Sequence, residues 1–406
     1  MPEAVIVSTA RSPIGRAGKG SLVDMRPDDL TAQMVRTALD KVPQLDPAEI
    51  DDLMLGCGLP GGESGFNMAR VVSVLLGYDH LPGTTITRYC SSSLQTTRMA
   101  MHAIKAGEGD VFVSAGVETV SRFDRGTSDS HPDTQNPLFD EAKARTAQAA
   151  EQGADSWQDP RDSGQLPDIY IAMGQTAEHL ARSKGISREE MDEFGVRSQN
   201  LAEKAIANGF WATDISPVTL PDGTTVSADD SPRPGVTVEG VSGLKPVFRP
   251  DGRVTAGNAC PLNDGAAAVV IMSDTKAAEL GLTPLARIVS TGVTALSPEI
   301  MGYGPVEASL QALDRAGMAI GDMDLVEINE AFAAQVIPSY RDLGIDLERL
   351  NVNGGAIAIG HPFGMTGARI TSTLINSLRF HDKQFGLETM CVGGGQGMAM
   401  VLERLS

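Results

Sequence analysis

Hydrophobic positions in the first 120 residues alternate between short apolar runs and runs with helical spacing. The short apolar runs predict buried strands, at residues 4–8, 52–56, 83–89 and 111–115. The runs with helical spacing predict helices, at residues 28–41 and 67–76 and after residue 90. This alternation is typical of βα units around a buried, largely parallel sheet. We therefore predict an α/β fold.

The pattern changes between residues 121 and 168, where Asp, Gly, Pro and Ser are frequent and periodicity is weak. The segment is long for a loop, so we expect it to be functional or to form an irregular subdomain. A helix is predicted from Ser187, where Glu190 completes a capping-box pattern, to Asn208-Gly209. A polar connector rich in Pro and Gly then spans residues 217–240.

The last third of the chain repeats the order of the first third. Four pairs of segments correspond in order and spacing: 6–9 with 288–291, 38–41 with 312–315, 52–54 with 324–326, and 111–116 with 389–393. In the same register, Cys90 and the helix after it correspond to His361 and a helix at 366–378. Two similar halves would bring these two turns toward a shared pseudo-twofold centre.

The composition excludes several classes of protein. Hydrophobic residues make up 41% of the 406 residues, which is enough for a real core, and no run of 18 apolar residues predicts a membrane span. The formal net charge of -19 disfavours nucleic acid and anionic membranes as partners, since both need a basic surface. Four cysteines at irregular spacing indicate free thiols and no metal knuckle. The absence of a signal or transit pattern favours a cytoplasmic location.

Cys90 is predicted at the point where a strand turns into a helix. The free N–H groups and the dipole of a helix start favour an anion, so we expect the pKa of the Cys90 thiol to be lowered. A buried structural cysteine is the alternative interpretation. His361 is bracketed by Gly360, Pro362 and Gly364, which indicate a tight backbone and not a core face. A thiol beside an imidazole that accepts its proton is what nucleophilic catalysis requires.

Two further residues end predicted strands of the second half. Cys391 precedes a glycine run and lies where α/β sheets display reactive groups. No βα unit follows the glycine run, so we do not interpret it as a nucleotide loop. Asn329 is either a structural cap or a group that holds a water or polarises a carbonyl.

A basic cluster stands out in this acidic chain between residues 233 and 253. Its members are Arg233, Lys245, Arg249 and Arg253. The cluster is either a phosphate site or a solvated loop, and the residues alone leave both interpretations open.

Five motifs in order resemble one enzyme family, the thiolases, which are acyl-CoA:acetyl-CoA C-acyltransferases. They are TRYCSSSLQ (87–95), TAGNACPLNDGAAA (255–268), NEAFAAQ (329–335), GHPFGMTGAR (360–369) and CVGGGQG (391–397). The resemblance covers essentially the whole chain, and it is closest to bacterial degradative 3-ketoacyl-CoA thiolases.

The resemblance implies a thiolase-like fold, in which two similar βα-repeat halves form a layered α-β-α-β-α core with an inserted loop domain. It divides the chain into four segments. Residues 1–120 are the N-terminal half of the core, 121–245 the loop domain that covers substrate and CoA, 246–275 a return to the N-terminal half, and 276–406 the C-terminal half.

The resemblance also implies roles for the candidate residues. Cys90 would accept the acyl group and His361 would activate it, while Cys391 would exchange a proton with the acetyl-CoA enolate. Asn329 would hold a water that forms one oxyanion site with His361, and the backbone N–H groups of Cys90 and Gly393 would form a second one. CoA would lie along seven residues, which are Met173, Arg233, Phe248, Ala256, Gly257, Cys260 and Phe332.

The chain departs from the family pattern at four positions. Ser93 stands where glycine is usual, Thr87 where asparagine is usual, and Cys260 where related enzymes have a serine that contacts pantetheine. Ala172 stands where acetoacetyl-specific enzymes tend to have histidine, and a smaller residue there would favour longer or branched acyl groups.

Three functions are compatible with these residues. The first is CoA-dependent cleavage of 3-oxoacyl-CoA. The second is condensation, by a biosynthetic acetyl-CoA acetyltransferase or by a ketoacyl-carrier-protein synthase, and Cys391 counts against the carrier-protein enzyme. The third is a non-catalytic acyl-CoA-binding subunit of a β-oxidation complex.

The resemblance further implies a homodimer or homotetramer, a possible β-oxidation partner, coenzyme A as co-substrate, and no permanently bound cofactor or metal.

Overall fold

Ten strands join into one sheet whose two parts meet along a narrow seam. The computed structural model describes residues 2–126, 133–153 and 156–406. In that part of the chain the strand order is β10-β11-β12-β9-β1-β8-β5-β3-β4, and β2 (Gly15–Arg16) pairs beside β8. β1 (Ala4–Arg11) and β9 (Ala286–Ala295) are joined by only two residue pairs, Val5 with Arg287 and Ile6 with Ala286. Each side of this seam is a smaller sheet with its own helices.

The N-terminal sheet mixes parallel and antiparallel strands. Its members besides β1 are β3 (Asp52–Cys57), β4 (Gly83–Ile86), β5 (Val111–Thr119) and β8 (Asn263–Ser273). β3 pairs parallel to β4 and β5, whereas β8 runs antiparallel to β5 and β1. Every residue of β1, β5 and β8 is buried, as expected for strands covered by helices on both faces.

The C-terminal sheet repeats this arrangement. Its members besides β9 are β10 (Leu325–Ile328), β11 (Phe385–Val392) and β12 (Gln396–Arg404). β10 and β11 are parallel, and β12 is antiparallel to both β11 and β9. The order of strands in the second half therefore follows that of the first.

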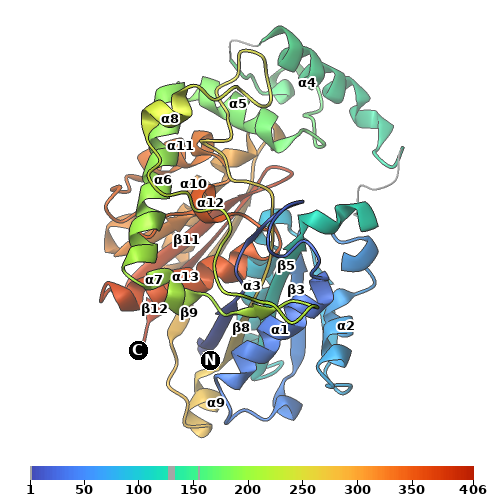
Figure 1. The fold of residues 1–406 in the computed structure, drawn as a ribbon, viewed down its shortest axis with the longest axis vertical. Helices are drawn as coiled ribbons and strands as arrows, with labels where there is room; N and C mark the ends of the chain where they lie inside the picture. The colour runs from blue at the N-terminus through green and yellow to red at the C-terminus, as the bar shows by residue number, and fades with distance from the viewer. Residues whose placement is uncertain (1, 127–132, 154–155) are drawn as a thin grey trace.

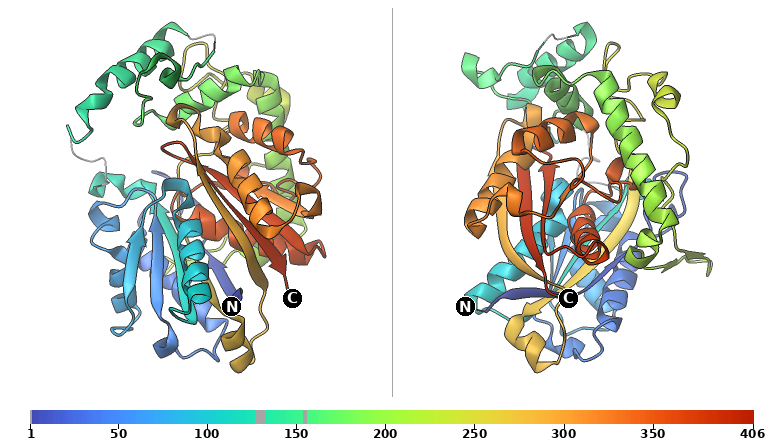
Figure 2. Two further views of the ribbon diagram at one scale, coloured as in Figure 1. Left: turned by 180° about the vertical axis from the view of Figure 1, so that it is seen from behind. Right: turned by 90° about the vertical axis from the view of Figure 1, so that its left-hand side faces the viewer.

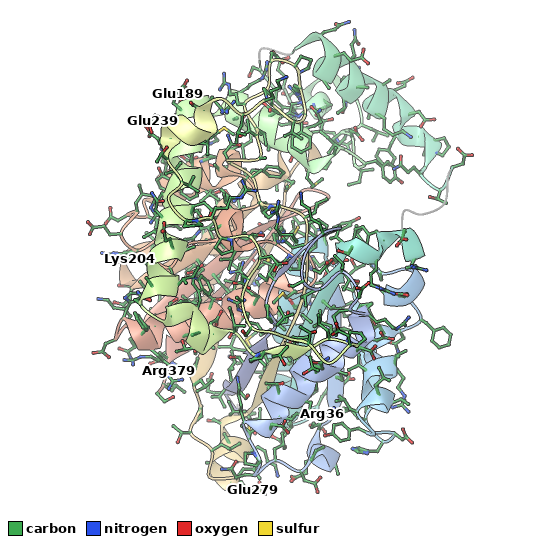
Figure 3. All side chains as sticks on the ribbon, viewed as in Figure 1. Arg36, Glu189, Lys204, Glu239, Glu279 and Arg379 are labelled. Carbon is green, nitrogen blue, oxygen red and sulfur yellow. The ribbon has the colours of Figure 1, made fainter. Side chains whose placement is uncertain are left out.

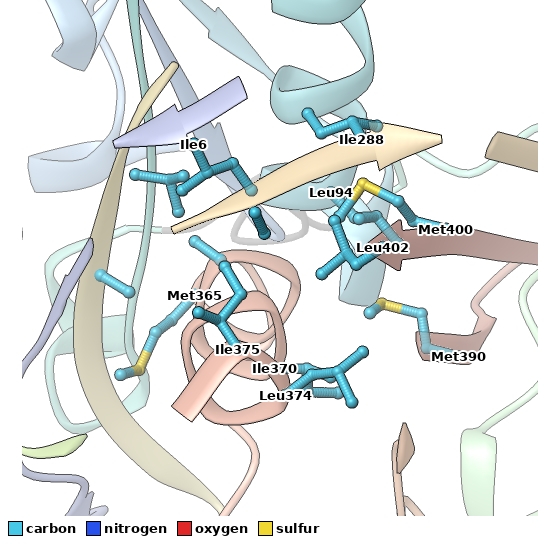
Figure 4. Close-up of a cluster of buried hydrophobic side chains, with 14 of the residues drawn as sticks. Ile6, Leu94, Ile288, Met365, Ile370, Leu374, Ile375, Met390, Met400 and Leu402 are labelled. Carbon is cyan, nitrogen blue, oxygen red and sulfur yellow. The ribbon is translucent and has the colours of Figure 1, made fainter. Parts of the chain in front are cut away.

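Two helices fill the space between the sheets. They are α3 (Ser92–Ala106) and α13 (Thr366–Phe380), and side chains of α13 such as Ile370 and Leu374 share one buried cluster with Ile6 of β1 and Met400 of β12 (Figure 4). Helices α1 (Pro27–Asp40) and α2 (Met68–Leu75) cover the outer face of one sheet, and α10 (Gly304–Ala316) and α11 (Ala333–Leu343) that of the other. The expected α-β-α-β-α layering is confirmed.

The remaining helices belong to the insertion and to short connections. They are α4 (Asp140–Gln152), α5 (Met173–Ser183), α6 (Arg188–Ala207), α7 (Phe210–Asp214), α8 (Val238–Ser242), α9 (Asp274–Glu279) and α12 (Ala356–Ile359), with a small hairpin of β6 (Val218–Thr219) and β7 (Thr225–Val226). α4 lies at one end of the molecule, and both termini lie toward the other end (Figures 1 and 2). The division of the chain at residues 120, 245 and 275 stays a prediction.

The predicted elements agree with the structure in type and order, and most differences concern where an element begins or ends. The strand expected at 83–89 ends at residue 86, and the strand expected at 389–393 already begins at residue 385. Helix α4 was not predicted, because only Ala142 of its residues is buried and no apolar stripe marks it. The capping box before α6 is confirmed, since Ser187 Oγ accepts from Glu190 N at 3.1 Å and the Glu190 carboxylate accepts from Ser187 N at 2.7 Å.

Many charged side chains lie on the outside of these layers, although others such as Arg11 and Arg369 are buried. The labelled residues Glu189, Lys204, Glu239, Glu279 and Arg379 lie at the edge of the molecule (Figure 3). Among residues 2–126, 133–153 and 156–406, no helix has the length and apolar character needed to cross a membrane.

The two central helices approach each other most closely at their first turns. A Cβ atom on Gly367 would lie 2.1 Å from the backbone nitrogen of Leu94, so only glycine fits there. Ser93 Oγ accepts a hydrogen bond of 2.9 Å from Ala368 N, which is one of the N–H groups that a helix start leaves without an internal partner. The serine found in place of the usual glycine therefore joins the two halves.

We predict that Ser93→Ala destabilises the protein. The substitution leaves a buried N–H group of Ala368 without an acceptor, which costs about 1–3 kcal/mol of unfolding free energy. Urea denaturation followed by circular dichroism measures this loss. The exposed Ser242, whose hydroxyl bonds only to Glu239 O, provides the control, and a loss no larger for Ser93→Ala than for Ser242→Ala would contradict the prediction.

Candidate active site

Cys90 lies in a strained turn immediately before α3. Tyr89 has a left-handed φ of 43°, which is uncommon for a residue with a bulky side chain. Ser92 Oγ stabilises the turn by donating to Tyr89 O at 2.7 Å and accepting from Arg88 N at 2.9 Å. The turn holds Cys90 with 8% of its surface exposed.

His361 is held by hydrogen bonds that fix its orientation. Its backbone N–H donates to Asn263 Oδ1 of β8 at 3.0 Å, and its Nδ1 lies 2.6 Å from Thr366 Oγ1. The single hydroxyl hydrogen of Thr366 is donated to Pro362 O at 2.7 Å, so Thr366 Oγ1 must accept from Nδ1–H. Neutral His361 therefore has its lone pair on Nε2, the nitrogen that is able to accept a proton.

Asn329 follows β10 and lies beside His361. Its Nδ2 atom is 3.3 Å from His361 Nε2, and the residue is 1% exposed. Its Oδ1 atom is buried and has no hydrogen-bond partner within the described part of the chain. A buried carbonyl oxygen of this kind requires a donor, such as a water or a ligand group.

Cys391 and Gly393 come from the end of β11 and the loop after it. Cys391 is fully buried, and burial raises the pKa of its thiol well above the ordinary value, with further contributions from Cys90 and Cys260. The backbone N–H groups of Gly393 and of Cys90 itself lie near enough to the Cys90 thiol to favour its thiolate. The structure thus brings Cys90, His361, Asn329, Cys391 and Gly393 together, as the sequence predicts.

Burial shifts the pKa values of Cys90 and His361 in opposite directions. It raises the pKa of the Cys90 thiol to about 12 and lowers the pKa of His361 to about 3. The expectation that the helix start lowers the Cys90 pKa is therefore wrong, because desolvation outweighs the two N–H donors. The stable pair is a neutral thiol and a neutral imidazole, so an ion pair forms only when both charges are stabilised together.

Glu118 near the end of β5 connects the turn after β3 with the turn of His361. Its carboxylate accepts from Gly58 N at 2.8 Å and from Gly364 N at 2.9 Å, and burial raises its pKa to about 7. Gly364 is three residues after His361, so a side chain of the N-terminal half supports the turn of the C-terminal half.

A cavity of about 620 Å³ leads to Cys90 and His361. All seven residues expected to bind CoA line it, which are Met173, Arg233, Phe248, Ala256, Gly257, Cys260 and Phe332. The sequence did not predict a further group of lining residues, which includes Arg16, Val241, Leu244, Val247, Met301, Ile357 and Phe363. Most of these lie in irregular segments or short helices, where no periodic pattern marks a lining position.

The basic cluster does not act as one unit. Arg233 lines the cavity, whereas Arg249 donates to Gln175 Oε1 at 2.6 Å and Arg253 donates to backbone carbonyls such as Ala181 O at 3.4 Å. Arg16, on β2, is a second guanidinium at the cavity. A phosphate site built on all four cluster members is not present.

No group of three or more His, Cys, Asp or Glu side chains in the described residues could hold a metal ion.

Comparison with known proteins identifies the family. A family model described as "Thiolase, N-terminal domain" matches residues 4–275, and one described as "Thiolase, C-terminal domain" matches residues 282–404. The chain belongs to the thiolase family. The family was the one expected from the motifs around Cys90, Asn329, His361 and Cys391.

Relatives of this thiolase match over their full length. The chain is 42% identical to a 3-ketoacyl-CoA thiolase of Bacillus subtilis, over 99% of this chain and 100% of that protein. It is 43% identical to a 3-oxoadipyl-CoA/3-oxo-5,6-dehydrosuberyl-CoA thiolase of Escherichia coli, over 100% of both. The dimeric peroxisomal thiolase of Saccharomyces cerevisiae has the same fold, with a TM-score of 0.87 and 33% identity over 99% of this chain and 97% of that one.

We predict that Thr366→Val slows the reaction of Cys90 with iodoacetamide about tenfold, because His361 loses the partner that fixes its tautomer and orientation. Peptide mass spectrometry at Cys90 measures the rate. Thr366→Ser keeps the hydroxyl and should restore it. Thr37→Val, which removes the same kind of bond to a carbonyl four residues earlier in α1, should have no effect. Equal rates for Thr366→Val and wild type would contradict the tautomer assignment.

We further predict that alkylation of Cys90 shows no plateau between about pH 7 and about pH 9, because reaction of the free thiolate adds to the reaction assisted by His361 and keeps rising with pH. The thiolate fraction rises with pH up to the thiol pKa, and the raised pKa of Cys90 puts this limit above the range. His361 stays neutral throughout, since its pKa is lowered. A plateau near pH 8.5, as a free thiol gives, would contradict the role assigned to burial.

Proposed function

We propose that the chain is a 3-ketoacyl-CoA thiolase, which cleaves 3-oxoacyl-CoA with CoA to give acetyl-CoA and a shortened acyl-CoA. One observation supports this proposal above the others. A cavity of about 620 Å³ is lined by the thiol of Cys90 and the imidazole of His361, and the second buried thiol, Cys391, lies near Cys90. Nucleophilic acyl transfer needs the first two groups, and carbon–carbon cleavage needs the third.

The first half-reaction begins at Cys90. His361 Nε2 takes the proton of the Cys90 thiol, and the thiolate attacks the 3-keto carbon of the substrate. The charged pair is unfavourable in the buried site, so it forms together with the bond to carbon, as the negative charge passes to the substrate oxygen. The C2–C3 bond then breaks, which leaves an acyl group on Cys90 and the enolate of acetyl-CoA.

Cys391 completes the first half-reaction. Its thiol donates a proton to C2 of the enolate and acetyl-CoA leaves. The raised pKa keeps this thiol protonated until the enolate forms, which is the state that an acid requires. In the second half-reaction, the thiol of free CoA gives its proton to the Cys391 thiolate and attacks the acyl group on Cys90. The Cys90 sulfur leaves and takes back the proton that His361 holds.

Two groups of donors stabilise the oxygen anions. The unpartnered Oδ1 of Asn329 holds a water that, with His361, faces the thioester oxygen of the enolate. The backbone N–H groups of Cys90 and Gly393 lie near the Cys90 sulfur, so they are the proposed donors to the carbonyl oxygen of an acyl group attached there. Removing one such donor typically costs about 3 kcal/mol of transition-state stabilisation.

Coenzyme A is the proposed co-substrate. Its pantetheine arm lies between apolar side chains such as Phe248 and Phe332, and Arg233 and Arg16 attract its phosphates in a chain that is otherwise strongly acidic. Cys260 replaces the serine that contacts pantetheine in related enzymes, so this contact is weaker here.

The chain is also proposed to form a homo-oligomer. β4 is an edge strand of the sheet, and the nearby side chains of Phe66 and Tyr89 are 95% and 45% exposed. A second copy paired at this edge covers both the strand and the apolar side chains, in agreement with the dimeric yeast thiolase. A cytoplasmic location and association with other β-oxidation enzymes stay predictions.

Two substitutions test the assigned roles. Cys90→Ser should abolish formation of an acyl-enzyme, because a serine hydroxyl in this position is not ionised by the neutral imidazole. Cys391→Ala should still take an acyl group from acyl-CoA but should lower the cleavage rate of acetoacetyl-CoA by at least about a thousandfold. Intact-protein mass spectrometry detects the acyl-enzyme, and loss of 3-oxoacyl-CoA absorbance measures cleavage.

The buried Cys57, which is not in the cavity, provides the matched control as Cys57→Ala. If folded wild-type protein cleaves no 3-oxoacyl-CoA of any chain length, the proposed function is wrong. If Cys391→Ala cleaves acetoacetyl-CoA normally, only the role of Cys391 is wrong.

A further inference from the structure

One buried carboxylate, Glu299, holds the inserted segment against the C-terminal half. Glu299 is 3% exposed and lies in the turn between β9 and α10. It accepts hydrogen bonds from Arg145 Nη2 at 2.9 Å, Trp157 Nε1 at 2.8 Å and Asp168 N at 2.8 Å. We call Glu299 with these three donors the Glu299 clasp. Arg145 lies on α4, so the clasp anchors the part of the insertion at the end of the molecule (Figure 1).

The turn that contains Glu299 also supports the loop after Cys391. Leu296 N donates to Gly395 O at 2.8 Å, and a Cβ atom on Gly395 would lie 2.6 Å from Pro298 N. Two residues after Glu299, Met301 lines the active-site cavity. A shift of this turn therefore moves both the loop and the cavity wall.

Asp168, one of the three donors of the clasp, is followed by a residue that contacts the loop after Cys391. Ile169 follows Asp168, and a Cβ atom on Gly394 would lie 3.7 Å from Ile169 Cδ1 and 3.8 Å from Tyr89 Cε2. Ile169 and Tyr89 thus lie over Gly394, next to the Gly393 N–H that lies near the Cys90 thiol. The contacts form a closed path from Glu299 through Asp168, Ile169 and Gly394 back to the turn of Glu299.

The contacts made by the Glu299 clasp affect the wall of the cavity that would hold the acyl chain. The proposed CoA channel reaches Cys90 along residues 231–262. Met301 is an apolar part of the wall of the same cavity, whereas Ile169 and Gly394 do not line it. An acetyl group on Cys90 needs little room in this cavity. A longer acyl chain must pass along the wall, so its fit depends on where Met301 is held.

We propose that Glu299 is a positioning residue that selects for long apolar acyl chains, by holding Ile169 and Met301 at the loop of Gly393 and Gly394. This inference rests on the proposed thiolase function. The clasp does not touch the reacting atoms, so its loss changes the preference for chain length more than the chemistry at Cys90.

The experiment measures kcat and KM for CoA-dependent cleavage of acetoacetyl-CoA and of 3-oxodecanoyl-CoA. Glu299→Ala should lower kcat/KM for the long substrate at least about tenfold more than for acetoacetyl-CoA. Glu299→Gln keeps an acceptor for the backbone N–H of Asp168 and should restore most of the lost selectivity. A general loss of stability would instead lower both values together.

Two further variants keep the test decisive. Trp157→Phe removes one hydrogen bond of the clasp and should shift the ratio of the two kcat/KM values in the same direction by about twofold to fivefold, even if Glu299→Ala does not fold. Glu403→Gln removes a carboxylate that pairs with Arg287 at the far end of β12 and should leave the ratio unchanged.

Unchanged ratios in all folded clasp variants would overturn the inference while the wild-type activity stands. Wild-type protein that cleaves neither substrate would overturn the proposed function instead.

Discussion

The close contact between the first turns of α3 and α13 determines where the reactive groups lie. Gly367 allows the backbone of α13 to approach Leu94, and Ser93 Oγ then binds Ala368 N. Cys90 immediately precedes one helix and His361 precedes the other by five residues. The position of the thiol relative to the imidazole therefore depends on helix packing, and flexible loops contribute little to it.

Burial has opposite effects on the site and on the fold. It stabilises the central layer through apolar contacts, and it also keeps the thiol and the imidazole uncharged. The site compensates with oriented polar groups, which are the N–H of Gly393, the hydroxyl of Thr366 and the carbonyl of Asn329. These polar groups stabilise charge only at the atoms where it develops during the reaction. Such an arrangement is called electrostatic preorganisation.

The sequence predicted two similar α/β halves and the central pair of residues because both depend on local patterns and on an ordered repeat, whereas the layered arrangement of the halves was implied by the family resemblance. It failed where other physical effects decide. Helix α4 forms from residues of high helix propensity with almost no buried face, so periodicity could not find it, although its Ala, Glu and Gln content could have. The pKa of Cys90 depends on its burial, and the Glu299 clasp joins residues up to 154 positions apart, so neither is visible in a local pattern.

Several contacts at the site cross between the two halves of the chain. Asn263 of β8 holds the backbone of His361, Glu118 of β5 holds Gly364, and Ser93 of α3 holds Ala368. Each of these contacts is a donor and an acceptor encoded in different halves. If one half is replaced by the corresponding half of a distant relative, these donors and acceptors no longer match, even when both halves fold. The two halves, although similar in architecture, therefore depend on each other for the geometry of the active site.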